Sequence, residues 1–352
     1  MNDDPSSAAA PAPGPVVFIN LWPQSGMKHY SESLMHALAP AARVLYVRNY
    51  ESTVPVESRR VRLDPVRLTG LADLFALVRE IIRRRPVAIH LNSELPILLP
   101  LFPLFAAFNS VITLHDAVPH EGESLAKRAF MRVHLWLVFL FMRKVIVHSA
   151  AIRDQLPPFL HARTHVLPHV NYQLWAREKS APAFDGPFVV LFFGRLLRYK
   201  GLDVLLEAFG SLDPQRFTLV IAGEGDLAEY RIDSPNIRTI NRFISDEEMA
   251  DLFNSAHAVA LPYLSASQSG VAYMAFAFEK PVVATRVGAL ADVVADDCNG
   301  FLIAPNSAAE LVTALERLAE PATWNRLVEN VRRQNLSADD EIRSRLLEIY
   351  RA

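Results

Sequence analysis

Short apolar segments alternate with amphipathic helical segments along most of the chain, and this alternation restricts the fold more than any other feature. Segments 16–21, 87–91 and 188–193 are rich in Val, Ile, Leu and Phe and have the length of buried strands. Segment 202–209 carries its leucines and its phenylalanine on one helical face. Repeated alternation of this kind predicts the α/β class, with mostly parallel, doubly wound sheets.

The chain of 352 residues is long enough for two domains that each bury a full core. A polar segment containing proline and glycine, 170–187, is typical of a linker. Ser337 and Asp340 resemble a capping box, which predicts the start of a separate last helix. The predicted parts are a flexible leader at 1–15, a first domain at 16–169, the linker at 170–187, a second domain at 188–336 and a C-terminal helix at 337–352 that packs back on the first domain.

Composition excludes several classes of protein. The formal net charge is −2, which offers no positive field for nucleic acid. The single cysteine, Cys298, excludes internal disulfides and cysteine-ligated metal, and it fits a reducing compartment. The leader lacks the features of a signal peptide, and the apolar run 95–108, predicted to be a buried helix, is too short and too interrupted by proline to span a bilayer. We therefore expect a cytoplasmic protein.

Segment 125–144 is predicted to form an unusually apolar helix. Basic residues stand at both ends, and the middle at 134–141 reads His-Leu-Trp-Leu-Val-Phe-Leu-Phe. One interpretation is a helix that lies on the inner face of the cell membrane, with its aromatic side chains in the bilayer and its basic ones against anionic lipid. The other interpretation is a core helix with solvated ends.

Segment 261–288 organises the second half of the chain. A strand ends at Pro262, a small polar loop follows at 265–270, and the next helix stops before Pro281. A loop of this kind aims backbone N–H groups and the positive end of the helix dipole at an anion. A plain turn between a strand and a helix is the alternative.

Segment 194–201 lies between another strand and helix and carries Arg195 and Lys200. Both would stand at the carboxyl edge of the sheet, where ligands bind in open α/β folds. A forked guanidinium and a compact ammonium suit a diphosphate, and each charge-assisted hydrogen bond contributes roughly 1.5–3 kcal/mol. Two solvated basic residues at the start of a helix are the alternative.

The whole segment 194–201, Gly-Arg-Leu-Leu-Arg-Tyr-Lys-Gly, resembles the Gly-Arg-Leu-x-x-x-Lys-Gly motif of the retaining glycosyltransferases of family 4, which have the GT-B fold. The resemblance covers nearly the whole chain from Val16 and is strongest over 188–303. It implies two Rossmann-like domains that face each other across a cleft, with the active site in that cleft. Further segments resemble the family in the expected order, namely Ala222–Gly225, Ile244–Met249, Leu261–Pro262, Lys280–Thr285 and Asn299–Leu302.

The resemblance implies that a nucleotide-diphosphate sugar is the donor and that the second domain holds it. GT-B enzymes are metal-independent, and no metal-ligating cluster is visible in the sequence, so neither a metal nor another cofactor is expected. The implied donor residues are Gly194, Arg195 and Lys200 at the diphosphate, Ser269, Gly270 and Val271 at the distal phosphate, and Arg242 and Phe243 beside the base.

The sequence departs from the family at one place. The family usually has two glutamates, eight residues apart, that contact the donor sugar and the ribose. Ala266 and Met274 occupy those positions here, and neither can ionise. A Ser-Gln-Ser-Gly version of the loop looks like a variant within the family, and our hypothesis is that Ser267, Gln268 or Ser269 contacts the donor sugar instead.

In the first domain, His115 follows a predicted strand and resembles the family histidine that faces the donor sugar and the acceptor. A histidine in that place can donate to developing charge, which makes it a candidate catalytic residue, and a structural histidine is the alternative. Other candidates are Gly26, His29, Tyr30, Asp116 and His120 for acceptor contacts, and, more weakly, His148 and His169 at later strand ends facing the same cleft.

The function expected from the resemblance is retaining transfer of a hexose to a glycan or lipid-linked glycan, in polysaccharide or glycolipid biosynthesis. Because both family glutamates are replaced, the alternative is a non-catalytic scaffold or sugar-nucleotide-binding protein in a polysaccharide assembly complex. A GT-B epimerase or phosphorylase lacks support, because no cofactor-lysine motif is present.

Overall fold

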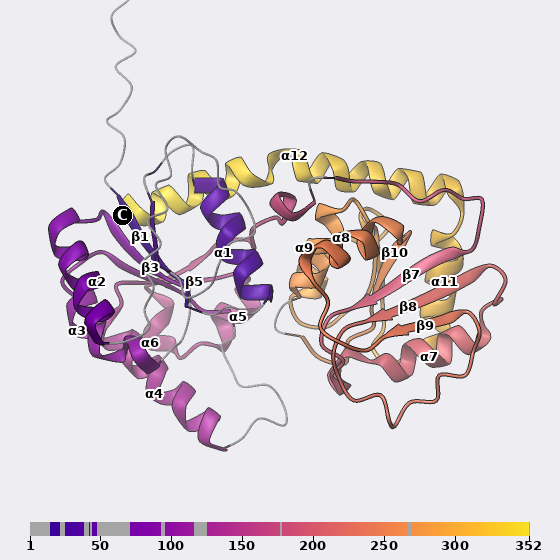
Figure 1. The fold of residues 1–352 in the computed structure, drawn as a ribbon, viewed down its shortest axis with the longest axis horizontal. Helices are drawn as coiled ribbons and strands as arrows, with labels where there is room; N and C mark the ends of the chain where they lie inside the picture. The colour runs from indigo at the N-terminus through magenta and orange to yellow at the C-terminus, as the bar shows by residue number, and fades with distance from the viewer. Residues whose placement is uncertain are drawn as a thin grey trace, which may run out of the picture.

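The computed structural model describes residues 15–21, 25–38, 42, 44–47, 71–92, 96–115, 125–176, 178–266 and 269–351. Four predicted site residues, Asp116, His120, Ser267 and Gln268, lie outside these ranges. Two α/β domains stand beside each other, and one long helix runs along both of them (Figure 1).

The N-terminal domain is a six-stranded parallel sheet with helices on both faces. Along β1, Val16 and Phe18 point to one face and Val17 and Ile19 to the other, and all four are fully buried. Such strands are apolar throughout because both sides are covered. The strands are β1 (Val16–Ile19), β2 (Val44–Val47), β3 (Ala88–Leu91), β4 (Ser110–Thr113), β5 (Lys144–Val147) and β6 (Thr164–Val166), in the order β2-β1-β3-β4-β5-β6.

The helices of this domain divide between the two faces. One face packs on α1 (Ser25–Leu38). The other packs on α2 (Leu71–Arg84), α3 (Phe102–Phe105), α4 (Leu125–Phe141), α5 (Ala150–Gln155) and α6 (Pro158–His161). The single helix predicted over 95–108 is instead the 3₁₀ helix η1 (Pro96–Leu101) followed by α3, because prolines within the run remove the hydrogen bonds that a continuous α-helix needs.

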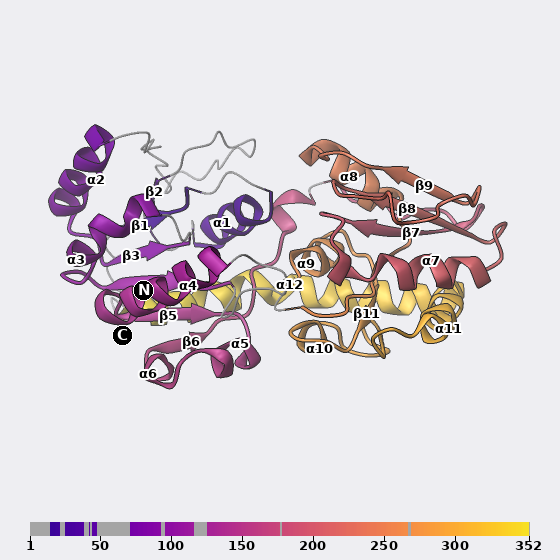
Figure 2. The same cartoon turned by 90° about the horizontal axis from the view of Figure 1, so that it is seen from below.

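The C-terminal domain repeats this plan with a second parallel sheet. Its strands are β7 (Phe188–Phe193), β8 (Phe217–Ala222), β9 (Ile237–Ile240), β10 (Ala258–Leu261), β11 (Val282–Thr285) and β12 (Gly300–Ile303), in the order β12-β11-β10-β7-β8-β9. One face packs on α7 (Leu202–Ser211) and α11 (Ala308–Leu318), and the other on α8 (Asp246–Ser255), α9 (Gly270–Ala277) and α10 (Leu290–Val293) (Figure 2).

The last helix, α12 (Pro321–Arg351), joins the two domains, and it corrects the predicted helix at 337–352. Because no glycine or proline follows Pro321 in this segment, nothing ends the helix before Ser337, and Pro321 itself stands at a favoured starting position. At its start Trp324 donates to the backbone oxygen of His257 in the C-terminal domain, at 2.8 Å. Farther on, Arg343 donates to the backbone oxygen of Ala37 in α1, at 2.6 Å.

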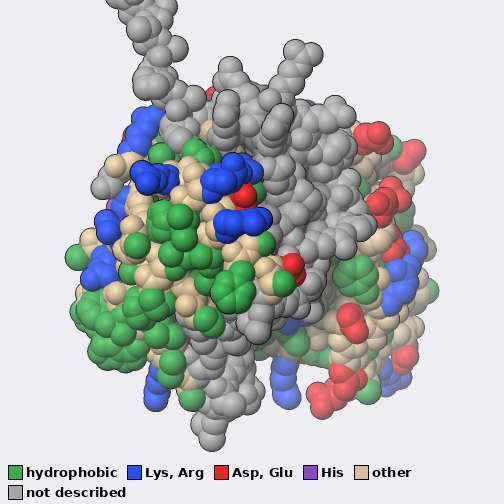
Figure 3. All heavy atoms as spheres, turned by 60° about the vertical axis from the view of Figure 1, so that its left-hand side comes forward, with side chains coloured by type: hydrophobic (Ala, Val, Ile, Leu, Met, Phe, Trp, Pro, Cys, Tyr) green, Lys and Arg blue, Asp and Glu red, His purple; other side chains and the backbone are tan. Residues whose placement is uncertain are grey.

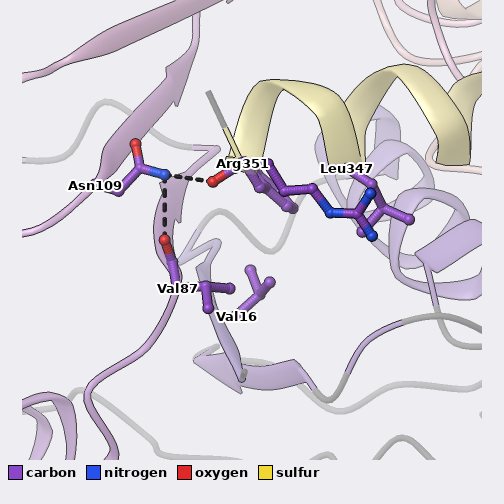
Figure 4. Close-up of a pocket in the computed structure, with 6 residues that line it drawn as sticks. Val16, Val87, Asn109, Leu347 and Arg351 are labelled. Atoms are coloured by element: carbon purple, nitrogen blue, oxygen red, sulfur yellow. Dashed lines mark hydrogen bonds between the residues drawn. The ribbon is translucent and has the colours of Figure 1, made fainter. Parts of the chain in front are cut away.

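The end of α12 is anchored to the amino edge of the N-terminal sheet. Asn109 donates to the backbone oxygens of Val87 and Tyr350, at 3.1 and 2.6 Å (Figure 4). The Tyr350 hydroxyl lies 2.7 Å from His90 Nδ1, whose ring is fully buried in β3. A cavity of about 310 Å³ beside these residues has an apolar lining that includes Val16. It lies at the opposite end of the strands from His115.

The core is shared between the domains. One cluster of buried side chains runs from Leu34 in α1 through Leu346 in α12 to Phe276 in α9. At the middle of α12, Asn335 accepts from Asn171 at 2.6 Å and donates to the backbone oxygen of Phe276 at 2.8 Å. The domains are therefore packed together on the side where α12 and the predicted linker cross between them.

Candidate functional site

The strand order of the C-terminal sheet places the predicted donor loops together. The chain proceeds from β7 outward to β8 and β9, then returns to β10 on the other side of β7. The loops that follow β7 and β10 are therefore neighbours at the carboxyl edge of the sheet, at the point where the strand order reverses. Open α/β folds bind ligands at such a switch point. These loops are 194–201 and 262–269.

Gly194, Lys200 and Val271 meet at this switch point. Gly194 has φ of 95°, a conformation that favours glycine. A Cβ atom added to it would lie 3.0 Å from Lys200 Nζ and 3.6 Å from a methyl group of Val271. The Lys200 ammonium therefore lies beside the first turn of α9, where the sequence predicted the distal phosphate.

Lys200 is a buried cation. Its side chain is 6% exposed, and Nζ donates to the backbone oxygen of Phe193 at 3.3 Å and lies 5.5 Å from the centre of the Tyr263 ring. Burial, with a smaller contribution from the charge of Arg195, lowers the pKa of Lys200 to about 8. The ammonium form persists at pH 7, and a bound anion would stabilise it further.

Two close backbone approaches fix this loop. Gly201 has φ of 68°, and a Cβ there would lie 2.0 Å from the backbone oxygen of Pro262. Leu264 donates from its backbone N–H to the backbone oxygen of Tyr199 at 2.7 Å. The loop after β7 thus rests directly on the loop after β10, which leads into α9.

The start of α9 has no side-chain cap on its backbone amides. Ser269 is the residue before the helix, and its side chain makes no capping hydrogen bond. Its hydroxyl instead lies 3.4 Å from the Tyr263 hydroxyl. The N–H groups at Gly270 and Val271 are therefore in the geometry that binds phosphate at a helix N-terminus.

The other predicted donor residues are exposed. Arg195 lies at the surface, close enough for its charge to affect Lys200. Arg242 makes two hydrogen bonds to Glu248, at 2.6 and 2.7 Å, so its guanidinium is already occupied. Phe243, which follows β9, is 66% exposed and offers a free aromatic face.

The N-terminal wall is a buried cluster of aromatic and imidazole rings. Tyr30 in α1 packs edge-on against His115, His148 and His169, with ring centres 4.7, 5.1 and 4.9 Å away. His169 stacks on Tyr273 of α9 at 4.3 Å. The rings therefore form a continuous path from His115 to the helix that begins at the predicted phosphate site.

A cavity of about 320 Å³ separates the two walls. His148, Ser149 and Pro168 line it from the N-terminal domain, and Ser269 and Tyr273 line it from α9. Burial lowers the pKa of both His115 and His169 well below the ordinary value. Both imidazoles are therefore neutral at pH 7.

His29, which the sequence predicted to contact the acceptor, lies at a contact between the two domains. Its Nε2 lies 2.8 Å from Asp246 Oδ1, and Lys28 Nζ lies 2.7 Å from Asp246 Oδ2. Burial would raise the pKa of Asp246, but the hydrogen bonds and charges of His29 and Lys28 outweigh it and lower that pKa. Burial lowers the pKa of His29 despite Asp246, so Lys28 carries the positive charge and neutral His29 donates a hydrogen bond.

Gly26 stands at the exposed start of α1, where a Cβ would meet nothing within 4 Å. The side chains of Tyr30 and His115, in contrast, are held in the ring cluster. The sequence analysis missed Tyr172, Trp175 and Tyr273. Tyr172 places its hydroxyl 3.3 Å from a Cβ added to Gly270, and the aromatic residues of the predicted linker were the available signal.

Comparison with known proteins agrees with this geometry. Residues 187–321 match the family described as "Glycosyl transferases group 1". This segment contains both switch-point loops, with Gly194, Lys200 and Val271. The match covers the C-terminal domain and the start of α12, so the C-terminal domain is similar to that family. The two-domain arrangement is the GT-B fold, which confirms the predicted fold class.

Individual relatives are similar to part of the chain. One is a D-inositol 3-phosphate glycosyltransferase of Corynebacterium aurimucosum, 36% identical over 38% of this chain and 35% of its own length. Another is a GDP-mannose:glycolipid 4-beta-D-mannosyltransferase of Xanthomonas campestris pv. campestris, 27% identical over 49% of each protein. The chain thus spans about a third to a half of the length of these relatives.

A solved structure matches over nearly the whole chain. HepE of Anabaena, in complex with UDP-glucose, superposes with a TM-score of 0.68 at 18% identity and covers 95% of this chain and 98% of its own. At that identity the match shows the fold of both domains and nothing finer.

Proposed function

We propose that this chain is a retaining glycosyltransferase that moves a hexose from a nucleotide-diphosphate sugar to a glycan or lipid-linked glycan. The observation that carries the proposal is the position of the Lys200 ammonium, buried against Gly194 and beside the first turn of α9. A buried cation next to helix N–H groups suits a diphosphate leaving group. The names of the relatives, which act on inositol phosphate and glycolipid acceptors or on GDP-mannose, support the same reaction class.

The residues of this chain have distinct roles in the proposed reaction. Lys200, with Arg195 at the mouth of the site, stabilises the charge that develops on the diphosphate as the bond to the sugar breaks. Ser269, Gly270 and Val271 orient the distal phosphate through their backbone N–H groups. His115 faces the donor sugar from the N-terminal wall. The charge on Lys200 and Arg195 does the work that a divalent ion would do at the diphosphate, so we propose no metal there.

The experiment is a donor-hydrolysis screen across UDP- and GDP-sugars, followed by transfer assays with the donor that is hydrolysed. Lys200→Ala should abolish hydrolysis and transfer while circular dichroism shows an unchanged fold. Lys179→Ala, a lysine of the linker segment, is the control and should retain turnover. Full turnover by Lys200→Ala would remove the diphosphate role.

The same screen distinguishes an enzyme from a non-catalytic scaffold. Met274 is 3% exposed in the core and Ala266 lies in the loop before α9, so neither replaces the family glutamates. The retained Lys200 and His115 favour an active enzyme. Calorimetric binding of a nucleotide sugar without any hydrolysis or transfer would favour the scaffold instead.

We also propose that α4 binds a membrane surface and that the protein meets its acceptor there. No helix in the described part of the chain is both long and apolar enough to cross a bilayer. Yet Val133, Trp136 and Leu140 on α4 are 56, 55 and 61% exposed, and Trp136 stacks on the part-exposed Phe159 of α6. Figure 3 shows hydrophobic side chains gathered on this side of the molecule with Lys and Arg side chains near them.

Exposed basic residues flank this apolar stripe at Arg132 and Arg143, which suits an interface rich in anionic lipid at the inner face of a cytoplasmic membrane. Flotation with vesicles containing phosphatidylglycerol tests the idea. The double variant Trp136→Glu with Leu140→Glu should lose vesicle binding and retain donor hydrolysis. Phe184→Glu, at an exposed phenylalanine of the linker segment, is the control. Equal flotation of the double variant and the wild type would contradict the proposal.

A further inference from the structure

Three histidines come together at the carboxyl ends of adjacent strands. His115 follows β4, His148 follows β5 directly, and His169 follows β6. These strands are neighbours in the sheet, so their ends lie side by side. One ring nitrogen from each histidine lies within 4.8 Å of the corresponding nitrogens of the other two.

Hydrogen bonds fix the tautomers of two of these rings. His148 Nδ1 lies 3.0 Å from the backbone oxygen of Leu167, and His169 Nδ1 lies 2.9 Å from the backbone oxygen of Val170. A carbonyl oxygen can only accept, so both Nδ1 atoms carry the hydrogen. In the neutral imidazole the lone pair is then on Nε2 of each ring. At His169 this nitrogen accepts a long hydrogen bond of 3.4 Å from the Tyr172 hydroxyl, which a bound metal ion would replace.

The third ring is fixed in the opposite sense. His115 Nε2 lies 2.9 Å from Asn92 Oδ1, and the amide nitrogen of Asn92 donates to Ser31 Oγ at 2.7 Å. With the amide in this orientation, Asn92 Oδ1 accepts from His115 Nε2. The lone pair of His115 is therefore on Nδ1.

Packing holds the three rings in this arrangement. Tyr30 contacts all of them with its ring, and His115 and His169 lie 5.0 and 4.9 Å from His148 between ring centres. Tyr273, in the C-terminal domain, stacks on His169 and restrains the ring of that histidine. Three imidazoles with defined tautomers are therefore preorganised on one side of the cleft.

We propose that His115, His148 and His169 form a binding site for a divalent transition metal, with Zn²⁺ as the ion that fits best. Imidazole nitrogen is a preferred ligand for zinc, and three protein ligands leave a fourth position for water. A ligating histidine commonly gives its other N–H to a carbonyl or carboxylate oxygen, which is the arrangement seen at each ring here. This site is separate from the Lys200 phosphate site, but it shares His115 with the donor-sugar contact of the proposed function, so a bound ion would replace the direct contact of His115 with the sugar.

The distances permit coordination with small adjustments. Zn–N bonds of 2.0–2.1 Å in a tetrahedral site place ligand nitrogens about 3.3 Å apart. Nitrogens already within 4.8 Å of one another reach that spacing by side-chain movements of about 1 Å. The cavity that His148 lines provides the route for the ion and the room for its water ligand.

Metal binding to the full chain tests the proposal, in a Cys298→Ser background that removes its single thiol. Protein stripped with a chelator and dialysed should take up one Zn²⁺ per chain. X-ray absorption at the zinc edge should show histidine scattering with nitrogen neighbours at about 2.0 Å. Because this measurement uses otherwise unaltered protein, it decides the question even if a histidine variant fails to fold.

Variants then assign the ligands. His148→Gln and His169→Gln should each weaken Zn²⁺ affinity by more than about 100-fold, and Asn92→Ala by about 10- to 100-fold through loss of the bond that orients His115. His165→Gln, on β6 but outside the cluster, is the matched control and should bind as the parent does. No saturable uptake by the parent chain, or equal affinity of His148→Gln and His165→Gln, would overturn the proposal.

Discussion

Replacing Lys200 by methionine should remove donor turnover and at the same time stabilise the fold. Burial lowers the pKa of Lys200 from 10.5 to about 8. The difference of about 2.5 corresponds to about 3 kcal/mol at 1.36 kcal/mol per pH unit, and this is the cost of keeping the ammonium charged in the folded state at pH 7. Methionine also gives up the hydrogen bond to Phe193, which contributes about 1 kcal/mol, so the expected net gain is about 2 kcal/mol.

The pH dependence has a defined sign. The folded pKa lies below the unfolded one, so between pH 8 and pH 10.5 the unfolded state binds more protons than the folded state. The free energy of unfolding of the wild type should therefore rise relative to Lys200→Met across this interval. The advantage of the variant should be largest at pH 7 and shrink toward pH 10.

Urea denaturation of both proteins at pH 7 and pH 10, without donor, measures these differences. Lys280 is a matched control, because its pKa is also lowered to about 8 by burial, while its ammonium donates to the backbone oxygens of Ser180 and Asn254. Lys280→Met should retain donor hydrolysis. The reasoning is refuted if Lys200→Met is less stable than the wild type at pH 7 by 1 kcal/mol or more, or if it still hydrolyses donor.

Three other variants test the packing around the site. Asp246→Asn removes the charge from both contacts to α1 and should cost about 1–3 kcal/mol at pH 7 in urea denaturation. Because the folded pKa is lowered, that loss should shrink progressively as the pH falls from about 4 toward the folded pKa. Gly201→Ala forces a Cβ against the Pro262 backbone oxygen and should lower the free energy of unfolding by more than about 2 kcal/mol, an effect that an unchanged thermal midpoint would exclude. Tyr350→Phe removes the hydrogen-bond partner of His90 Nδ1 and should cost about 1–2 kcal/mol, with no change in donor KM.

The architecture was predictable because buried parallel strands read as apolar runs. Segment 188–193 is a strand in the structure with the predicted bounds, and strands and helices alternate along most of the chain. The exception was the last helix. A capping-box pattern at Ser337 is a local signal, and it cannot start a helix where the preceding turns are already helical and packed.

The donor half of the site was predictable for a related reason. Lys200 and Val271 both stand one loop after a strand, and strand order alone brings those loops together. The contacts that depend on the other domain were not predictable in this way. Asp246 reads as an ordinary acidic residue in the first turn of a helix, and nothing local to it indicates that Lys28 and His29 will face it.

The three histidines also could not be predicted to lie together from local sequence signals. His115 was singled out from its motif, whereas His148 and His169 were weak candidates because each occurs alone in the sequence. The expectation that no metal-ligating cluster exists came from spacing along the chain. Metal sites that recur as short motifs have ligands a few residues apart, but ligands contributed by successive strand ends are separated by whole βα units.

The chain crosses between its two domains at the segment before β7 and again along α12. A helix of 31 residues is about 46 Å long and resists bending, and it is fastened to both halves by Trp324, Asn335 and Tyr350. Both crossings lie on the side of α12, so any movement of one half relative to the other must keep that side together.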